Sequence, residues 1–167
     1  DACAGPGGRL SHIYELAEGK AKMVAVERSK SQFRRIEENM LRLGHTEGVT
    51  YHLEDFLKWK SEEKFDKLLL DSPCTGMGVL RRHPEGKWHK DVQSVHKLAE
   101  IQRELLAKSL THLKKGGELI YSICSYEFEE APRQLKWLLE KHADNIELVS
   151  PVQYLPDYFK RYVTREN

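Results

Sequence analysis

Two cysteines stand where the sequence could place reactive groups at the ends of buried strands. Residues 71–74 (DSPC) follow the apolar run 68–70, and Cys124 lies within residues 121–125 (YSICS), at the end of a second apolar run. A cysteine thiolate is a strong nucleophile, and a neighbouring carboxylate such as Asp71 can bind or orient a polar substrate. A single free cysteine is more often a small core residue. Two cysteines in equivalent positions, Cys74 and Cys124, favour covalent chemistry instead.

A glycine-rich segment at residues 1–9 (DACAGPGGR) is typical of a turn that leads into a helix. Glycine allows a backbone to approach a ligand closely, and the first turn of a helix has free N–H groups. The candidate ligand contacts are therefore Ala4, Gly5, Pro6, Gly7, Gly8 and Arg9. Taken alone, the segment is equally compatible with an ordinary turn, and it lacks the spacing of a phosphate-binding loop.

Two acidic residues follow the next two predicted strands. Glu27 comes after the apolar run 23–26, where an acid can bond both hydroxyls of a ribose. Asp55 comes after the alternating segment 49–53 and could meet an adenine edge. Each of them could instead be an ordinary solvated or capping acid. Glu27 together with the glycine-rich turn predicts a cofactor that contains adenosine.

Short apolar strands and amphipathic helices alternate along the chain and must position these residues. Helical spacing occurs in four segments and strand patterns in five: helices at 10–17, 33–43, 98–113 and 135–139, strands at 23–26, 49–53, 68–70, 119–123 and 146–149. This alternation predicts an α/β fold with a doubly wound, mostly parallel sheet. Ligands bind such sheets at the carboxyl ends of the strands, which is where the candidate residues fall.

Composition narrows the class of protein. The chain has 167 residues, 40% of them hydrophobic and 32% charged, with a net charge of +1. We therefore expect a single domain over residues 1–167, no membrane span, and no binding of nucleic acid by bulk charge. Three cysteines without a CxxC pair argue against a disulfide framework and favour a reducing, cytoplasmic compartment. No metal is expected, because no ligand pair has short-range spacing.

A locally basic segment at residues 81–90 (RRHPEGKWHK) directly follows the first cysteine segment. Basic side chains neutralise phosphates, and Trp88 could stack on a base. The candidate RNA contacts are Arg81, Arg82, His83 and Lys87. The alternative is a solvated loop with Trp88 in the core.

Three segments in this order resemble the Sun/RsmB family of RNA (cytosine-5) methyltransferases: DACAGPGGR, DSPCTGMGVLRRHPEGKW and YSICSYEFEE. The resemblance covers Asp1 to about Pro132. It implies a Rossmann-like class I methyltransferase sheet, which we expect to be incomplete at both ends, without its first strand and its closing strands. It also implies S-adenosylmethionine as cofactor, held by residues 4–9 and Glu27, with Asp55 near the adenine.

The same resemblance implies roles for the reactive residues. Cys124 would attack the cytosine and Cys74 would help to release the product, while Asp71 would lie near the cofactor and the target base. Asp71 would either bond the ring at its N3 side or only orient its loop. The implied partner is RNA, ribosomal RNA ahead of transfer RNA. A non-catalytic RNA-binding or assembly factor that keeps the fold is the alternative function.

Overall fold

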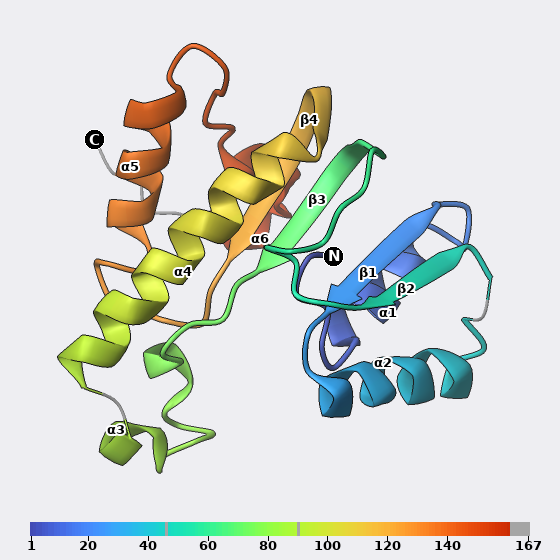
Figure 1. The fold of residues 1–167 in the computed structure, drawn as a ribbon, viewed down its shortest axis with the longest axis horizontal. Coiled ribbons are helices and arrows are strands. Elements are labelled where there is room, and N and C mark those ends of the chain that lie inside the picture. The colour runs from blue at the N-terminus through green and yellow to red at the C-terminus, as the bar shows by residue number, and fades with distance from the viewer. Residues whose placement is uncertain (46, 90, 161–167) are drawn as a thin grey trace.

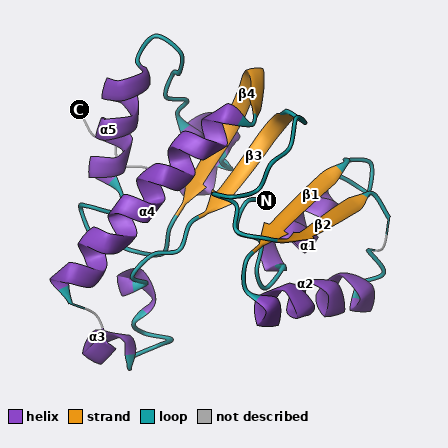
Figure 2. Ribbon diagram, in the orientation of Figure 1, coloured by secondary structure: helices purple, strands orange, loops and turns teal. Residues whose placement is uncertain are grey.

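The computed structural model describes residues 1–45, 47–89 and 91–160, without the side chains of Lys87 and His89. Helices and strands alternate along the chain, as Figures 1 and 2 show. The elements are α1 (Gly8–Leu16), β1 (Met23–Glu27), α2 (Lys30–Arg42), β2 (Val49–Leu53), β3 (Phe65–Asp71), the 3-10 turn η1 (Met77–Val79), α3 (Gly86–His89), α4 (Val92–Thr111), β4 (Leu113–Ser122), α5 (Pro132–His142), the 3-10 turn η2 (Pro151–Tyr154) and α6 (Asp157–Lys160).

The four strands form two parallel pairs that the first residues of the chain join. β1 pairs with β2, and β3 pairs with β4. Between them, Val26 donates its N–H to the carbonyl of Asp1 at 2.9 Å, and Ala2 donates to Leu69 at 2.9 Å. Ala4 also donates to Val26 at 3.1 Å. Residues 1–4 therefore lie between β1 and β3, as the position of the N-terminus in Figure 1 also shows.

Helices cover both faces of this sheet, because alternate residues of β1 point into two different cores. Val24 and Val26 pack with residues of β3 and α4, including Leu70 and Leu106. Ala25 packs on the other face, with Leu10, Ile36 and Met40 of α1 and α2. A parallel sheet buried on both faces is the arrangement that the alternating pattern predicts. The expected doubly wound α/β class is confirmed.

Two predicted elements differ from the structure: one strand is absent and one helix ends earlier. The strand expected at 146–149 is wrong: the N–H groups of Asn145 and Ile146 donate back to the carbonyl of His142, which closes a turn after α5. The helix expected over 98–113 ends at Thr111. The residues after it already belong to β4, where Leu113 pairs with Phe65 and an irregular register absorbs the glycines at 116 and 117.

Candidate active site

The two cysteines predicted from the sequence lie side by side. β3 and β4 are neighbouring parallel strands with Asp71 opposite Ser122. The segments that follow the two strands therefore leave the sheet at the same edge. The Sγ atoms of Cys74 and Cys124 are 3.3 Å apart. The backbone N–H of Cys124 also donates to Cys74 Sγ at 3.3 Å. Cys124 is exposed, whereas Cys74 is half-buried.

Their surroundings distinguish the cysteines chemically. Burial, together with the hydrogen bond to Cys124, raises the pKa of Cys74 to about 11. Burial raises the pKa of Cys3, in the glycine-rich turn, to about 12. At neutral pH both groups are therefore protonated thiols. Because Cys74 keeps its proton, the 3.3 Å contact is best read as Cys74 S–H donating to Cys124.

A cavity of about 200 Å³ lies beside the glycine-rich turn. It is lined by Asp1, Cys3, Ala4, Gly5, Pro6, Gly8, Arg9 and Asp71. Residues from the turn and from the end of β3 thus surround one space, although more than sixty positions separate them in the sequence. Of the predicted turn contacts, Gly7 alone is not part of this lining.

The turn has its shape because two of its glycines are required. Gly7 caps α1 with a positive φ of 97°, a conformation that favours glycine, and its N–H donates to the carbonyl of Ala4 at 2.7 Å. A Cβ on Gly5 would lie 2.5 Å from Gln32 Cβ and 2.7 Å from Glu27 Oε2. Any larger residue at position 5 would therefore push the turn away from Glu27.

Glu27 holds the turn with its carboxylate at the end of β1. Its Oε2 accepts the N–H of Gly5 at 3.0 Å, and its Oε1 accepts the N–H of Ser29 at 2.7 Å. Each carboxylate oxygen has a second lone pair, so both can also accept a hydroxyl. Glu27 therefore holds the glycine-rich turn next to the cavity, although its own side chain is not among the residues that line it.

Asp71 forms an ion pair with Arg9 across the cavity. The side chain of Asp71 is 23% exposed and that of Arg9 is 53% exposed, so the pair is open to solvent and to a ligand. An exposed pair of this kind adds little to stability. Its consequence is positional: the guanidinium fixes the carboxylate at the edge of the cavity, three residues before Cys74.

Asp55 adopts the capping role that the sequence left open as an alternative. Its Oδ1 accepts the N–H of Leu57 at 3.0 Å, and its carbonyl accepts the N–H groups of Lys58 and Trp59. The side chain is half-buried in this turn. Asp55 does not line the cavity beside the glycine-rich turn. Glu27 does not line the cavity either, and Asp55 follows β2, the strand that pairs with β1, two residues after the partner of Glu27.

The basic segment after the first cysteine lies on the surface. Arg81, Arg82 and His83 are all exposed, and His83 Nδ1 lies 3.3 Å from Glu85 Oε1. Trp88 is 77% exposed, so the alternative that placed it in the core is wrong. The side chain of Lys87 lies outside the described part of the structure.

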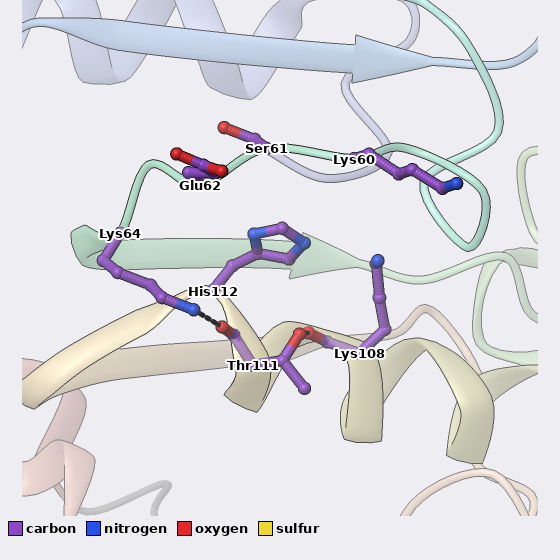
Figure 3. A pocket seen from close by; sticks show the side chains of 7 residues that line it. All are labelled: Lys60, Ser61, Glu62, Lys64, Lys108, Thr111 and His112. Carbon is purple, nitrogen blue, oxygen red and sulfur yellow. Dashed lines mark hydrogen bonds between the residues drawn. The ribbon is translucent and has the colours of Figure 1, made fainter.

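A larger cavity of about 340 Å³ lies at the opposite edge of the sheet (Figure 3). It is lined by Lys60, Ser61, Glu62, Lys64, Lys108, Thr111 and His112. These residues precede β3 and β4, so the cavity is at the amino ends of those strands. None of the candidate catalytic residues is among them. Lys64 Nζ is bonded to the carbonyl of Thr111 there, as Figure 3 shows.

Sequence reasoning missed a buried polar cluster behind the two cysteines. We call Thr75, Gln102, Ser125 and Glu130 the Glu130 cluster; each is at most 8% exposed. Gln102 interrupts the apolar face of α4 between Ile101 and Leu105. A polar residue in such a position is the signal that could have indicated a buried hydrogen-bonded group.

The part of the chain that the structure describes has neither a metal-binding cluster nor a membrane-spanning helix. No group of three or more histidine, cysteine or acidic residues there could hold a metal ion. Across the same residues, no helix combines the length and the apolar character that crossing a membrane requires.

The sequence matches known proteins over the region that carries this site. The model of the 16S rRNA methyltransferase RsmB/F family matches residues 1–156. The chain belongs to this family. It is 40% identical over 145 residues to ribosomal RNA small subunit methyltransferase B of Escherichia coli, covering 86% of the chain and 34% of that protein. The protein of the same name from Shigella flexneri is 41% identical over the same length.

Solved structures agree with the family membership. NSun6 from Pyrococcus horikoshii, in a structure with SFG, has a TM-score of 0.78 and 34% identity, over 85% of this chain and 36% of that one. A methyltransferase homologue from the same organism has a TM-score of 0.73 and 33% identity, over 84% and 43%. The chain thus spans about a third of the curated relatives. The Sun/RsmB resemblance, the fold, and S-adenosylmethionine as the family's cofactor are confirmed.

Proposed function

We propose that the protein methylates carbon 5 of a cytosine in ribosomal RNA through a covalent intermediate on Cys124. The observation that carries this proposal is the contact of Cys74 with Cys124, whose Sγ atoms are 3.3 Å apart at the sheet edge where β3 ends with Asp71. Family membership supports an RNA substrate. Transfer to a nitrogen or oxygen needs no enzyme thiol, so a pair of thiols at the site favours carbon methylation.

The surroundings of the two thiols support the division of roles that the family resemblance implies. Carbon 5 of cytosine is a poor nucleophile until a thiolate adds at carbon 6. Cys124 is exposed, so its sulfur is open to a target base. Cys74 is half-buried with a pKa of about 11, so it stays protonated at neutral pH. We therefore assign the attack to Cys124. After methyl transfer the carbon 5 proton passes to water, the bond between Cys124 and carbon 6 breaks, and the Cys74 S–H donates to the departing Cys124 sulfur.

The residues around the cavity of about 200 Å³ fit S-adenosylmethionine. The cofactor supplies a methyl group activated by a sulfonium. Glu27, fixed by the N–H groups of Gly5 and Ser29, would accept the ribose hydroxyls. Ala4, Gly5, Pro6 and Gly8 would line the remainder, together with the Arg9–Asp71 ion pair at the end of β3. Asp55, after the neighbouring strand β2, would lie near the adenine.

Asp71 is proposed to bond the target ring on its N3 and amine side. Asp71 lines the cavity and precedes Cys74 by three residues. Its carboxylate would accept a hydrogen from the amine and from a protonated N3, and protonation of N3 helps the ring to absorb the electrons added at carbon 6. The exposed Arg81, Arg82 and His83 would contact phosphates of the same RNA.

Release of tritium from the substrate tests the proposed position of methylation. Small-subunit RNA made with tritium at carbon 5 of cytosine is incubated with the full-length protein and S-adenosylmethionine. We expect one tritium to enter water for each methyl group incorporated. Methyl incorporation without tritium release would show that an atom other than carbon 5 is methylated. Cofactor binding without either signal would favour the non-catalytic RNA-binding factor.

A further inference from the structure

The buried Glu130 cluster connects the two cysteine segments by hydrogen bonds. Glu130 is 0% exposed and lies eight residues after the end of β4. Its Oε1 accepts the backbone N–H of Thr75 at 2.9 Å and the Nε2 of Gln102 at 2.9 Å. Its Oε2 accepts the hydroxyl of Thr75. Thr75 is the residue directly after Cys74, so this carboxylate fixes the first cysteine segment by two separate bonds.

The second cysteine segment is tied to the same carboxylate through Thr75. Thr75 Oγ1 lies 3.0 Å from the hydroxyl oxygen of Ser125, the residue directly after Cys124. A carboxylate can only accept, so the single hydroxyl hydrogen of Thr75 points to Glu130. Ser125 must then donate to Thr75, while its own oxygen accepts the N–H of Glu127 at 3.1 Å. The bonds from Ser125 through Thr75 to Glu130 therefore have one fixed direction.

Burying the Glu130 carboxylate costs free energy unless hydrogen-bond donors compensate its charge. Burying a charge requires several compensating donors, and here they are hydrogen bonds, since Glu130 takes part in none of the ion pairs found among the described residues. Gln102 also donates to the carbonyl of Pro73 at 3.0 Å, so α4 holds the same loop from a third side. All of these bonds converge on the residues that flank the two thiols.

We propose that Glu130 is a positioning residue that keeps Cys74 and Cys124 face to face. The proposal rests on the two-thiol chemistry of the proposed function, but its consequence for the thiols is independent of activity. Without the carboxylate, Thr75 and Ser125 lose their common anchor, and the 3.3 Å contact between the Sγ atoms opens. Cys74 then loses its hydrogen bond to Cys124 and part of its burial, which are the causes that hold its proton.

Alkylation of Cys74 by iodoacetamide at pH 8, followed by peptide mapping, measures this directly in the full-length protein. Far below the pKa, a fall of one unit in the Cys74 pKa raises its thiolate fraction about tenfold. A fall of one unit also lowers the nucleophilicity of the thiolate about threefold, so Glu130→Ala is expected to raise the alkylation rate of Cys74 about three- to fourfold. In Glu130→Gln one side-chain oxygen still accepts the N–H groups of Thr75 and Gln102, and the amide NH2 can donate to the Thr75 hydroxyl, so the rate should stay within about twofold of the wild type.

Gln134→Ala is the matched control, because Gln134 is also 0% exposed and bonds to the carbonyls of Ala99 and Glu129 rather than to the cysteine segments. It should leave Cys74 alkylation unchanged. In the methylation assay, Glu130→Ala should lower kcat about 100-fold while the KM for the cofactor changes little, since Glu130 does not line the cavity.

Two results would overturn the positioning role. One is a folded Glu130→Ala protein in which Cys74 reacts at the wild-type rate. The other applies if that variant does not fold: Thr75→Val keeps the volume of Thr75 and removes only its hydroxyl, so wild-type alkylation there would contradict the proposal. If wild-type protein methylates no RNA yet Cys74 alkylation responds as expected, the proposed function fails and the positioning role stands.

Discussion

Replacement of Cys124 by alanine should lower methyl transfer to RNA by at least about 1,000-fold, because the variant lacks the thiol that is proposed to add to the ring. Cys74 is half-buried and keeps its proton to a pKa of about 11, so it is a poor substitute at neutral pH. The measurement is single-turnover incorporation of labelled methyl groups into small-subunit RNA. A residual rate within tenfold of the wild type would remove Cys124 from the mechanism.

Cofactor binding controls for the fold of this variant. Cys124 does not line the cavity beside the glycine-rich turn, so the dissociation constant for S-adenosylmethionine should stay within about twofold of the wild type. Cys124→Ser is the matched chemical control. It changes one atom, and its hydroxyl is far less acidic than a thiol, so it should be as inactive as the alanine variant.

Replacement of Glu27 by alanine should weaken S-adenosylmethionine binding about 100-fold or more. Hydrogen bonds to a charged group each contribute about 1.5–3 kcal/mol, and the ribose would lose two of them. The variant also frees the N–H groups of Gly5 and Ser29, which the carboxylate now holds at 3.0 and 2.7 Å. The turn around the cavity therefore loosens as well. Isothermal titration calorimetry with the cofactor measures the effect.

Glu38→Ala is the comparison for Glu27, because Glu38 is an exposed acid on α2, whereas Glu27 accepts the N–H groups of Gly5 and Ser29. It should bind the cofactor as the wild type does. Glu27→Gln should fall between the two, because its amide oxygen can still accept one N–H but carries no charge. Equal affinity in Glu27→Ala and Glu38→Ala would show that Glu27 is an ordinary solvated acid.

Much of this fold followed from local pattern. The strand at Glu27 and the strand at Asp71 are short apolar runs that end at an acid, and periodicity is a strong signal for both. The residue pattern of one segment cannot show which strands will pair in the sheet. The run 146–149 has strand composition but forms no strand, and its first residue, Ile146, closes the turn after α5. The irregular register between Phe65 and Lys67 likewise depends on how β4 meets β3.

The candidate site was predictable to the extent that its residues stand at strand ends. Cys74 and Cys124 could be assigned to such ends, but the 3.3 Å contact between them depends on β3 and β4 being neighbours. Asp55 shows the limit of that reasoning, because a residue after a strand can simply cap its own turn. Glu130 is apparent only in three dimensions, since one acid in the run EFEE looks like its neighbours.

Denaturing electrophoresis of the full-length protein with small-subunit RNA and S-adenosylmethionine tests the central claim most directly. It compares Cys74→Ala with Cys124→Ala and detects protein–RNA adducts that survive denaturation. The two-thiol account predicts an adduct that accumulates only in Cys74→Ala, because Cys124 still attacks while release is blocked. An adduct only in Cys124→Ala would reverse the two roles. No adduct in either variant, with no methyl transfer by wild-type protein that binds the cofactor, would contradict covalent catalysis altogether.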